Sequence, residues 1–403
     1  MRTGAWNARR SLQELLSRAV ETVTPAAQLV VRQNGVAQME GAYGWLDPET
    51  RQRPTQGDTL FDMASVSKLF TVTAFMTLVE QGQVSLDQPV RTVLPDFDGL
   101  RPIQPYENPL KPGAMVDVPG EAALADAGSV TFRELLTHTS GLPAWRPLWR
   151  QADADAARRM ALETFFSYPT GSRIIYSDIG LILLGMSIET LTGQRLDSAI
   201  RDRVTLPLGL EHTGFRPLPA AAQEPPGTPG VPNIAPTEFC AWRGRRIVGE
   251  VHDENAWRLG GIAGHAGIFS TAADIAVFGQ CFLDGGAPLL SKATVAEMTR
   301  IQAEAGSPHE RVRRGLGFAL WSADPEASSN PFSQRAYGHT GFTGTCLWID
   351  PERALVVAFL TNEVYHGREG RGIGALRVAV HRSIVAEAAL PDAATSSTGA
   401  QLP

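Results

Sequence analysis

Two short segments rich in β-branched and small residues flank a strong turn signal near the start of the chain. Residues 26–32 and 36–43 are predicted strands, and the Asn34-Gly35 pair between them favours a tight hairpin turn. Ahead of them, residues 11–20 place leucines on one helical face and charged residues between them. The chain is therefore predicted to open with a helix followed by a two-stranded hairpin.

The middle of the chain has helical and loop-like patterns. The apolar run over residues 69–81 predicts a helix that ends at Gly82, and from there to about residue 245 no segment alternates convincingly like a strand. Proline, glycine and alanine crowd residues 217–236, which predicts a long surface connection.

Strand patterns return near the end of the chain. Residues 345–349 and 355–360 flank a turn at 350–353, which predicts a second hairpin, and residues 374–389 follow as a predicted helix. The last residues, 391–403, have the composition of a disordered tail.

Strands at both ends with helices between them predict a discontinuous α/β (α+β) domain interrupted by a helical domain. We place the α/β domain at residues 1–75 and 246–390 and the inserted all-helical domain at residues 76–245. No internal repeat is visible.

Composition narrows the classes of partner. The chain has 403 residues, 43% of them hydrophobic, and a formal net charge of -6, so it can bury a large core but presents no basic field for nucleic acid or an anionic membrane. It has no uninterrupted apolar run of signal-peptide type and none of membrane-spanning length. We expect small-molecule ligands and, for the chain as given, a cytoplasmic location.

Cysteine and histidine spacing gives no metal signature. The three cysteines are widely spaced, which predicts reduced and mostly buried thiols. His252 and His265 lie near Asp253 and Glu254, but without the tight spacing of a metal site. We therefore predict neither a metal nor another cofactor.

The segment Ser65-Val66-Ser67-Lys68 is the strongest candidate for chemistry. Ser65 and Lys68 are three residues apart, so on a helix they share one face, and an uncharged Lys68 amine there is able to take the Ser65 proton. A helix that begins near Ser65 also favours negative charge at that point. Alone, the pattern is common as a helix N-cap beside a solvated lysine, so it needs support from elsewhere in the chain.

Two further motifs supply that support. Tyr176-Ser177-Asp178 precedes the apolar run 179–186, and His339-Thr340-Gly341 precedes the strand-like segment 343–349. Serine, then tyrosine, then a basic residue before Thr-Gly is the chain order of the penicillin-recognising serine hydrolases. The chain resembles the class C β-lactamase, DD-peptidase and family VIII esterase group.

The resemblance runs from the Asn34-Gly35 turn to about Glu387. It includes two looser blocks, residues 135–142 and 260–267, in which His138 and His265 lie. It implies a β-lactamase-like antiparallel sheet flanked by helices, with the site in the cleft beside the inserted helical domain. We expect His138 and the turn after it to order a loop near this cleft.

The same resemblance implies the roles of the site residues. Ser65 is the nucleophile, and Lys68 and Tyr176 move protons between Ser65 and the leaving group. Lys68 is expected to have a lowered pKa when buried, but the sequence leaves open which of Lys68 and Tyr176 is the base. The backbone N–H groups of Ser65 and Phe342 are the expected oxyanion hole.

Two positions depart from the usual pattern of the group. Asp178 stands where an asparagine is usual, and a carboxylate accepts hydrogen bonds from Lys68 but donates none to a substrate carbonyl. His339 stands where the β-lactamases usually carry lysine, so a fixed charge for a substrate carboxylate is lost. Thr340 keeps its hydroxyl, and Gly341 allows close approach of a substrate backbone.

These observations favour a serine hydrolase that cleaves small esters or amides through an acyl-Ser65 intermediate. One alternative keeps the mechanism and changes the substrate to D-amino-acid peptides, cell-wall fragments or antibiotics. The other, of a different class, is a non-hydrolytic acyl- or penicillin-binding protein. The sequence does not decide between hydrolase and acyltransferase, and it does not predict the oligomeric state.

Overall fold

The fold is known for most of the chain. The computed structural model describes residues 9–111, 113–118, 123–218, 233–307 and 311–388. The predicted tail at 391–403 and most of the proline-rich segment at 217–236 lie outside these residues.

An antiparallel sheet of eight strands forms the central layer. Both predicted hairpins are confirmed, and Asn34 and Gly35 adopt the positive φ angles, 52° and 76°, that a tight hairpin turn requires. Strands from the two ends of the chain pair directly, with Val30 opposite Ala358. Across the sheet the strands are, in order, β12 (Ala303–Ala305), β13 (Val312–Arg314), β14 (Ala319–Leu320), β15 (Tyr337–Thr340), β16 (Cys346–Asp350), β17 (Leu355–Thr361), β1 (Ala26–Gln33) and β2 (Val36–Gly44).

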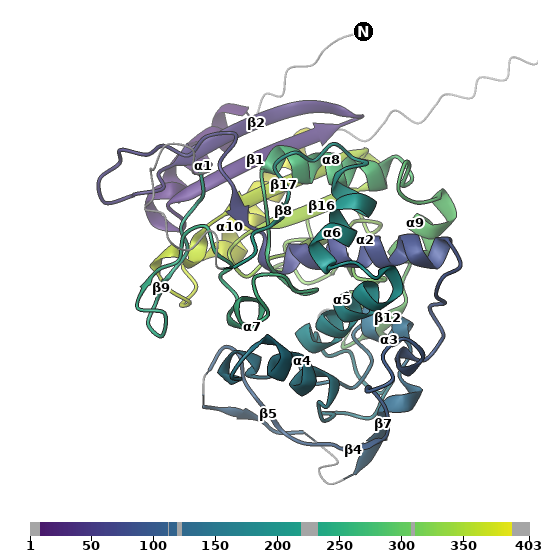
Figure 1. Ribbon diagram of the computed structural model, residues 1–403. Helices are drawn as coiled ribbons and strands as arrows, with labels where there is room; N and C mark the ends of the chain where they lie inside the picture. Colours follow the sequence, from purple (N-terminus) through teal and green to yellow (C-terminus); the bar gives the residue numbers. More distant parts are fainter. Residues whose placement is uncertain (1–8, 112, 119–122, 219–232, 308–310, 389–403) are drawn as a thin grey trace, which may run out of the picture.

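Helices bury both faces of this sheet. Alternate residues of β17 belong to different core clusters: Val357 packs with helices α1 (Arg9–Thr22) and α10 (Ile373–Glu387), whereas Val356 packs on the opposite face. There helix α8 (Ala272–Leu283) lies on β17, and its Phe278 stacks on Phe70 of helix α2 (Ser67–Glu80) at a centroid distance of 4.3 Å. The fold is thus the expected β-lactamase-like arrangement of an antiparallel sheet flanked by helices (Figure 1).

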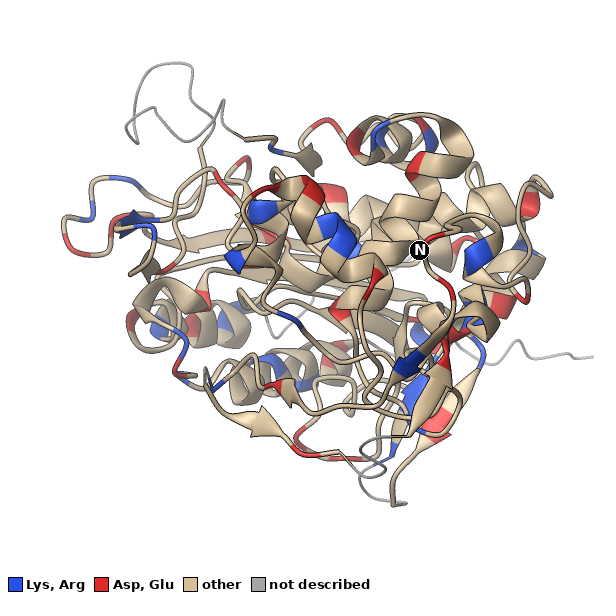
Figure 2. Ribbon diagram, turned by 60° about the horizontal axis from the view of Figure 1, so that its bottom comes forward, with Lys and Arg blue, Asp and Glu red and all other residues tan. Residues whose placement is uncertain are grey.

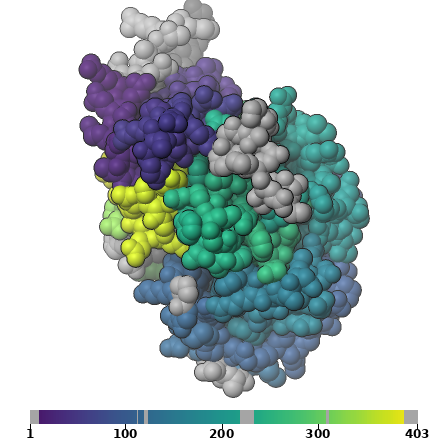
Figure 3. Space-filling view, turned by 60° about the vertical axis from the view of Figure 1, so that its left-hand side comes forward, coloured from purple at the N-terminus to yellow at the C-terminus, as the bar shows by residue number. Residues whose placement is uncertain are grey.

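The segment between the two parts of the sheet forms the other end of the molecule. Figure 3 shows purple and yellow atoms, from the two ends of the chain, adjoining at one end and blue atoms at the other. The division into domains at residues 76 and 245 stays a prediction. The remaining helices are α3 (Phe132–Leu136), α4 (Ala154–Leu162), α5 (Asp178–Thr192), α6 (Leu196–Ile200), α7 (Glu254–Arg258) and α9 (Lys292–Thr299).

The prediction that no strand lies between residues 83 and 245 is wrong. Short strands occur there, and each spans only two or three residues, too few for an alternating pattern to be visible in the sequence. They and their partners are β3 (Phe61–Asp62), β4 (Leu100–Pro102), β5 (Tyr106–Glu107), β6 (Met115–Val116), β7 (Leu124–Asp126), β8 (Gly214–Phe215), β9 (Phe239–Cys240), β10 (Arg245–Arg246) and β11 (Ile268–Ser270).

Charge and thiol positions agree with the composition. In the view of Figure 2, basic and acidic residues are interspersed along the ribbon. Cys240, Cys281 and Cys346 are free and buried, as predicted. Among the described residues, no helix combines the length and the apolar character needed to cross a membrane.

Gly264 allows the glycine-rich loop of residues 260–267 to lie directly against α5. A Cβ at Gly264 would overlap the Leu181 carbonyl oxygen and lie 3.0 Å from the Gly185 nitrogen. Gly264→Ala should therefore lower the free energy of unfolding by about 1–3 kcal/mol, measured by urea denaturation. The control is Gly374→Ala, where an added Cβ meets nothing within 4 Å. Equal effects of the two substitutions would contradict this packing argument.

Candidate active site

Ser65 lies on a strained turn at the start of α2. It is the middle residue of a 3₁₀ turn, Ala64–Val66, and the preceding Ala64 has φ = 45°, which is unusual for a residue with a side chain. The buried Asp62 holds this turn, because its Oδ1 accepts the Ala64 N–H at 2.8 Å and its Oδ2 accepts the His252 N–H at 2.6 Å. Burial raises the pKa of Asp62 to about 6. The expected helix beginning near Ser65 is confirmed.

Lys68 lies on the same helical face as Ser65 and is almost fully buried. Its Nζ is 2.8 Å from Ser65 Oγ, 3.0 Å from the His265 carbonyl oxygen and 2.8 Å from Asp178 Oδ1. These contacts come from three separate segments, so the amine sits at the point where α2, the start of α5 and the 260–267 loop meet. The structure thus brings Ser65, Lys68 and Asp178 together.

The expected lowering of the Lys68 pKa is wrong in direction. Burial alone disfavours the ammonium form, but the Asp178 carboxylate and Tyr176 outweigh it and raise the pKa of Lys68. At neutral pH the side chain is therefore an ammonium that donates a hydrogen bond to Ser65 Oγ. Before it accepts the Ser65 proton, Lys68 must first lose one of its own.

Tyr176 is beside the same pair. Lys68 Nζ lies 4.8 Å from the centroid of its ring, and Lys68 and Ser65 are the hydrogen-bonding neighbours of its buried hydroxyl. Burial raises the pKa of Tyr176, although the Lys68 charge acts in the opposite direction. Because both Tyr176 and Lys68 hold their protons at neutral pH, the choice of base stays open.

His138 positions the Tyr176 segment. Its Nδ1 accepts the Ser177 N–H at 3.1 Å, and its ring lies against Tyr176 at a centroid distance of 4.7 Å. Burial lowers the pKa of His138 well below its ordinary value, so Nδ1 stays an acceptor. Ser177 in turn accepts the Gly180 N–H at 3.3 Å as the N-cap of α5. The loop-ordering role predicted for His138 is thus confirmed.

The turn after Thr340 is tied to the strand that precedes Ser65. Thr343 Oγ1 donates to the Asp62 carbonyl at 2.7 Å, and Thr345 Oγ1 donates to the Met63 carbonyl at 3.0 Å. A Cβ at Gly341 would lie 2.6 Å from the same Met63 oxygen, so glycine is needed here for packing within the chain. This arrangement places the backbone of Phe342 beside Ser65, at the lining of a shared cavity.

The two expected oxyanion donors are available. Ser65 lies in the first turn of its helix, where N–H groups have no intrahelical partner. The Phe342 N–H makes no backbone hydrogen bond among the described residues. Two such donors near the serine match the requirement for stabilising a developing oxyanion.

His339 is neutral, as expected. Burial, followed by the charges of Lys68 and Arg314, lowers the pKa of His339 to about 3. Nδ1 donates to the Thr340 carbonyl at 2.8 Å, and the buried Nε2 has no partner among the described residues.

The expectation that this side of the site lacks positive charge needs correction. Arg314 and Arg377 line the same cavity as His339 and Thr340. Arg377 donates to the carbonyl oxygens of Gly341 and Thr345 at 2.9 and 3.0 Å. The Arg314 side chain makes no hydrogen bond or ion pair with the described residues and lies over the Tyr176 ring, 5.4 Å from its centroid. Arginines from other segments therefore supply the charge that residue 339 lacks.

Ser65 opens onto two cavities that share a boundary. One, of about 260 Å³, is lined by Asp178, and the other, of about 570 Å³, is lined by His339. The residues common to both are Ser65, Leu110, Tyr176, Phe342 and Arg368. Cavities of this size suit small molecules or the end of a larger one.

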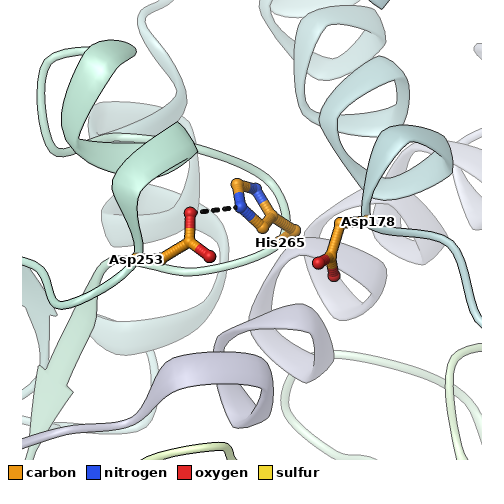
Figure 4. A group of neighbouring side chains, drawn as sticks. All are labelled: Asp178, Asp253 and His265. Carbon is orange, nitrogen blue, oxygen red and sulfur yellow. Dashed lines mark hydrogen bonds and ion pairs between the residues drawn. The ribbon is translucent and has the colours of Figure 1, made fainter. Parts of the chain in front are cut away.

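A group of possible metal ligands lines the first cavity. Ligand atoms of Asp178, Asp253 and His265 lie within 4.8 Å of one another, and Asp253 Oδ1 is 2.9 Å from His265 Nε2 (Figure 4). Lys68 already places a positive charge 2.8 Å from Asp178, which disfavours a cation at this point. The Lys68 ammonium group thus already neutralises the carboxylate to which a metal ion would bind.

Sequence reasoning missed several residues of the site. Arg314, Arg368 and Arg377 lie far from any motif and reach the cavity only through the pairing of strands and helices. The sequence suggests only a metal-binding role for His265 and Asp253, although the position of His265 inside the glycine-rich block is a signal that it lies near the site.

Asp178→Asn tests how the carboxylate sets the Lys68 titration. Because Asp178 raises the pKa of Lys68, removing its charge should lower that pKa. If Lys68 must be neutral for Ser65 to attack, the rising limb of the pH profile of kcat should move to lower pH. The control is Asp117→Asn, an exposed residue outside both cavities. Superimposable pH profiles for wild type and Asp178→Asn would refute this coupling.

Known proteins resemble this chain over most of its length. The beta-lactamase family model matches residues 12–381. An N-acetylmuramyl-L-alanine amidase of Bacillus subtilis (strain 168) is 32% identical over 387 residues, which cover 88% of this chain and 80% of the relative. A Salmonella agona (strain SL483) protein, provisionally named a D-alanyl-D-alanine carboxypeptidase, is 33% identical over 336 residues, 76% of this chain and 69% of the relative.

A solved structure shows the same fold at lower identity. EstCE1, described as a hydrolase with promiscuous acyltransferase activity, is 21% identical with a TM-score of 0.69, over 93% of this chain and 98% of that one. The family model covers most of the chain, and both relatives exceed 30% identity over more than two thirds of it. The chain therefore belongs to the beta-lactamase family, a family of serine hydrolases.

Proposed function

We propose that Ser65 is the nucleophile and that the protein hydrolyses small esters and amides through an acyl-Ser65 intermediate. The observation that carries the proposal is the contact set of Lys68 Nζ, which lies 2.8 Å from both Ser65 Oγ and Asp178 Oδ1 at the edge of a small-molecule cavity. A buried serine–lysine–carboxylate chain of this kind both orients the hydroxyl and carries its proton.

The reaction follows from these positions. In the form of the protein in which Lys68 has lost a proton to solvent, Ser65 Oγ attacks the substrate carbonyl carbon, and its proton passes to the Lys68–Tyr176 pair. The N–H groups of Ser65 and Phe342 stabilise the negative oxygen until the bond to the leaving group breaks. The leaving alcohol or amine then takes the proton. Water then attacks the acyl ester, gives one of its protons to Ser65 Oγ through the same pair, and the acid is released.

A second candidate function is an amidase or peptidase that acts on carboxylate-bearing substrates. Arg314 favours it, because an arginine without an ion-pair partner that lines the cavity beside Ser65 suits a substrate carboxylate. The two curated relatives carry the names of a muramyl-alanine amidase and a D-alanyl-D-alanine carboxypeptidase, which also supports this candidate.

Three substrates and one mass measurement test these proposals. Initial rates are measured on a short-chain p-nitrophenyl ester, a chromogenic cephalosporin and a D-alanyl-D-alanine peptide. Acid-quenched samples are digested to find which peptide carries the acyl group. Acylation of the Ser65 peptide with ester turnover supports the first function, and faster cleavage of the carboxylate-bearing substrates supports the second. Stoichiometric acylation without turnover would instead indicate an acyl-binding protein.

A further inference from the structure

Three carboxylates line the 260 Å³ cavity next to Ser65. Asp253 and Glu254 come from the start of α7, and Asp178 comes from the start of α5. We call these three residues the acidic wall. Their side chains are partly exposed, at 24% for Asp253, 16% for Glu254 and 20% for Asp178, so each is accessible from the cavity.

The lining of the cavity at the acidic wall has fewer positive than negative side chains. Lys68 pairs with Asp178 at 2.8 Å. Arg368 pairs with Glu254 at 2.8 Å, but it also pairs at 2.8 Å with Glu238, a fourth carboxylate. Among the residues that line the cavity, the three carboxylates of the wall face one permanent cation, Arg368, whereas Lys68 and Arg243 act on the wall from outside this lining.

Asp253 keeps one oxygen available. Its Oδ1 accepts the Ala256 N–H at 2.7 Å and lies 2.9 Å from His265 Nε2. These contacts hold the carboxylate in place, and its Oδ2 has no hydrogen-bond partner among the described residues. One oxygen of the Asp253 carboxylate is therefore held by the protein, and the other is available to a ligand in the cavity.

His252 is an independent sign of a ligand at this wall. It is only 3% exposed and lines the same cavity, yet neither of its ring nitrogens has a hydrogen-bond partner among the described residues. The nearest carboxylate oxygen, on Glu238, is 3.8 Å from Nε2, beyond hydrogen-bond distance. A buried polar ring without a partner is costly, unless a ligand supplies the missing bond.

We propose that the acidic wall and His252 bind a positively charged amine, so that the preferred substrates are esters or amides that carry an ammonium group close to the scissile bond. An ammonium group has three donors, which the free oxygens of the wall and an imidazole nitrogen are able to accept. This proposal rests on the proposed function, because it names a substrate class for the same serine.

The two cavities differ in charge, so they favour one orientation of such a substrate at Ser65. In the lining of the other cavity Arg314 and Arg377 outnumber Glu363 and disfavour an ammonium group, whereas the acidic wall attracts it. A divalent cation is the rival occupant, but Lys68 lies within the group of ligands that it would need. A small organic ammonium requires only part of the wall and leaves the Lys68–Asp178 pair intact.

The test uses pairs of substrates that differ only in charge. Alanyl p-nitroanilide is compared with its N-acetyl form, and 4-(aminomethyl)phenyl acetate with its uncharged 4-ethylphenyl analogue, so that a primary ammonium group is tested on each side of the scissile bond. We expect kcat/KM to be at least about tenfold higher for the charged member of one pair. That ratio corresponds to 1.4 kcal/mol of extra transition-state binding. Equal values within both pairs would overturn the proposal.

Glu254→Gln and Asp253→Asn then locate the effect. Each should reduce the charged-to-neutral ratio of kcat/KM at least about threefold, and Glu254→Gln provides the readout if Asp253→Asn fails to fold. The control is Glu211→Gln, which removes one exposed carboxylate outside both cavities. A ratio that is unchanged in a folded Glu254→Gln protein, or that disappears on addition of EDTA to the wild type, would overturn an ammonium site at this wall.

The Ser65→Ala protein separates this proposal from the proposed function. If Ser65→Ala hydrolyses these substrates as fast as wild type, the nucleophile assignment fails. If only the charge preference is missing, while Ser65 is required, the amine site alone fails.

Discussion

Ser65→Ala should lower kcat/KM for a p-nitrophenyl ester on the order of 10⁴-fold or more, because no other group in the described site replaces the attacking oxygen. The substitution removes one hydroxyl, which accepts a hydrogen bond from Lys68 at 2.8 Å, so the fold should be retained. Initial rates, together with a thermal unfolding curve, measure both effects.

The matched control for this substitution is Ser307→Ala. Ser307 is exposed and lines neither cavity, so its replacement should leave the rate unchanged. Residual activity of Ser65→Ala above about one tenth of wild type, in a folded and uncontaminated sample, would exclude an acyl-Ser65 mechanism.

Lys68→Met should also abolish turnover, with a loss on the order of 10³-fold in kcat, and it should weaken the fold as well. Methionine fills a similar volume but leaves Asp178 without its cation at the buried end of the site. Breaking a buried ion pair typically costs about 3–5 kcal/mol, and we expect less here because Asp178 keeps some contact with solvent.

A double variant separates the two roles of Lys68. Lys68→Met with Asp178→Asn removes both charges, so it should recover much of the stability that Lys68→Met loses but none of the activity. Urea denaturation and initial rates of the wild type, the two single variants and the double variant complete this cycle. Recovery of turnover in the double variant would show that Lys68 acts only on the fold.

Local patterns in the sequence predicted those elements that local residues determine. The Asn34-Gly35 turn forms because its residues tolerate positive φ, and α2 ends where Gly82 adopts φ = 68°. The second hairpin and the last helix follow in the same way from apolar runs and the turn between them. Two-residue strands such as β5 could not be predicted, because distant partners and not their own residues define them.

The protonation state of Lys68 could not be predicted from the sequence, because it depends on a residue that is distant along the chain. A buried lysine alone has a lowered pKa, and only the position of Asp178 at 2.8 Å reverses that direction. Likewise, residue 339 correctly indicated a neutral imidazole, but the arginines that replace the lost charge come from β13 and α10. Their side chains reach the cavity through sheet register and helix packing, which no motif encodes.

The sequence by itself determined the order of the three motifs, the hairpins, the family and the identity of the candidate nucleophile, since each depends on residue types at short spacing. Tertiary structure alone decided that Lys68 is an ammonium, that Arg314 and Arg377 face one cavity, and that the acidic wall faces the other. Electrostatic effects depend on distance in space and on burial, and these arise only when segments such as α2, α5 and the 260–267 loop pack together.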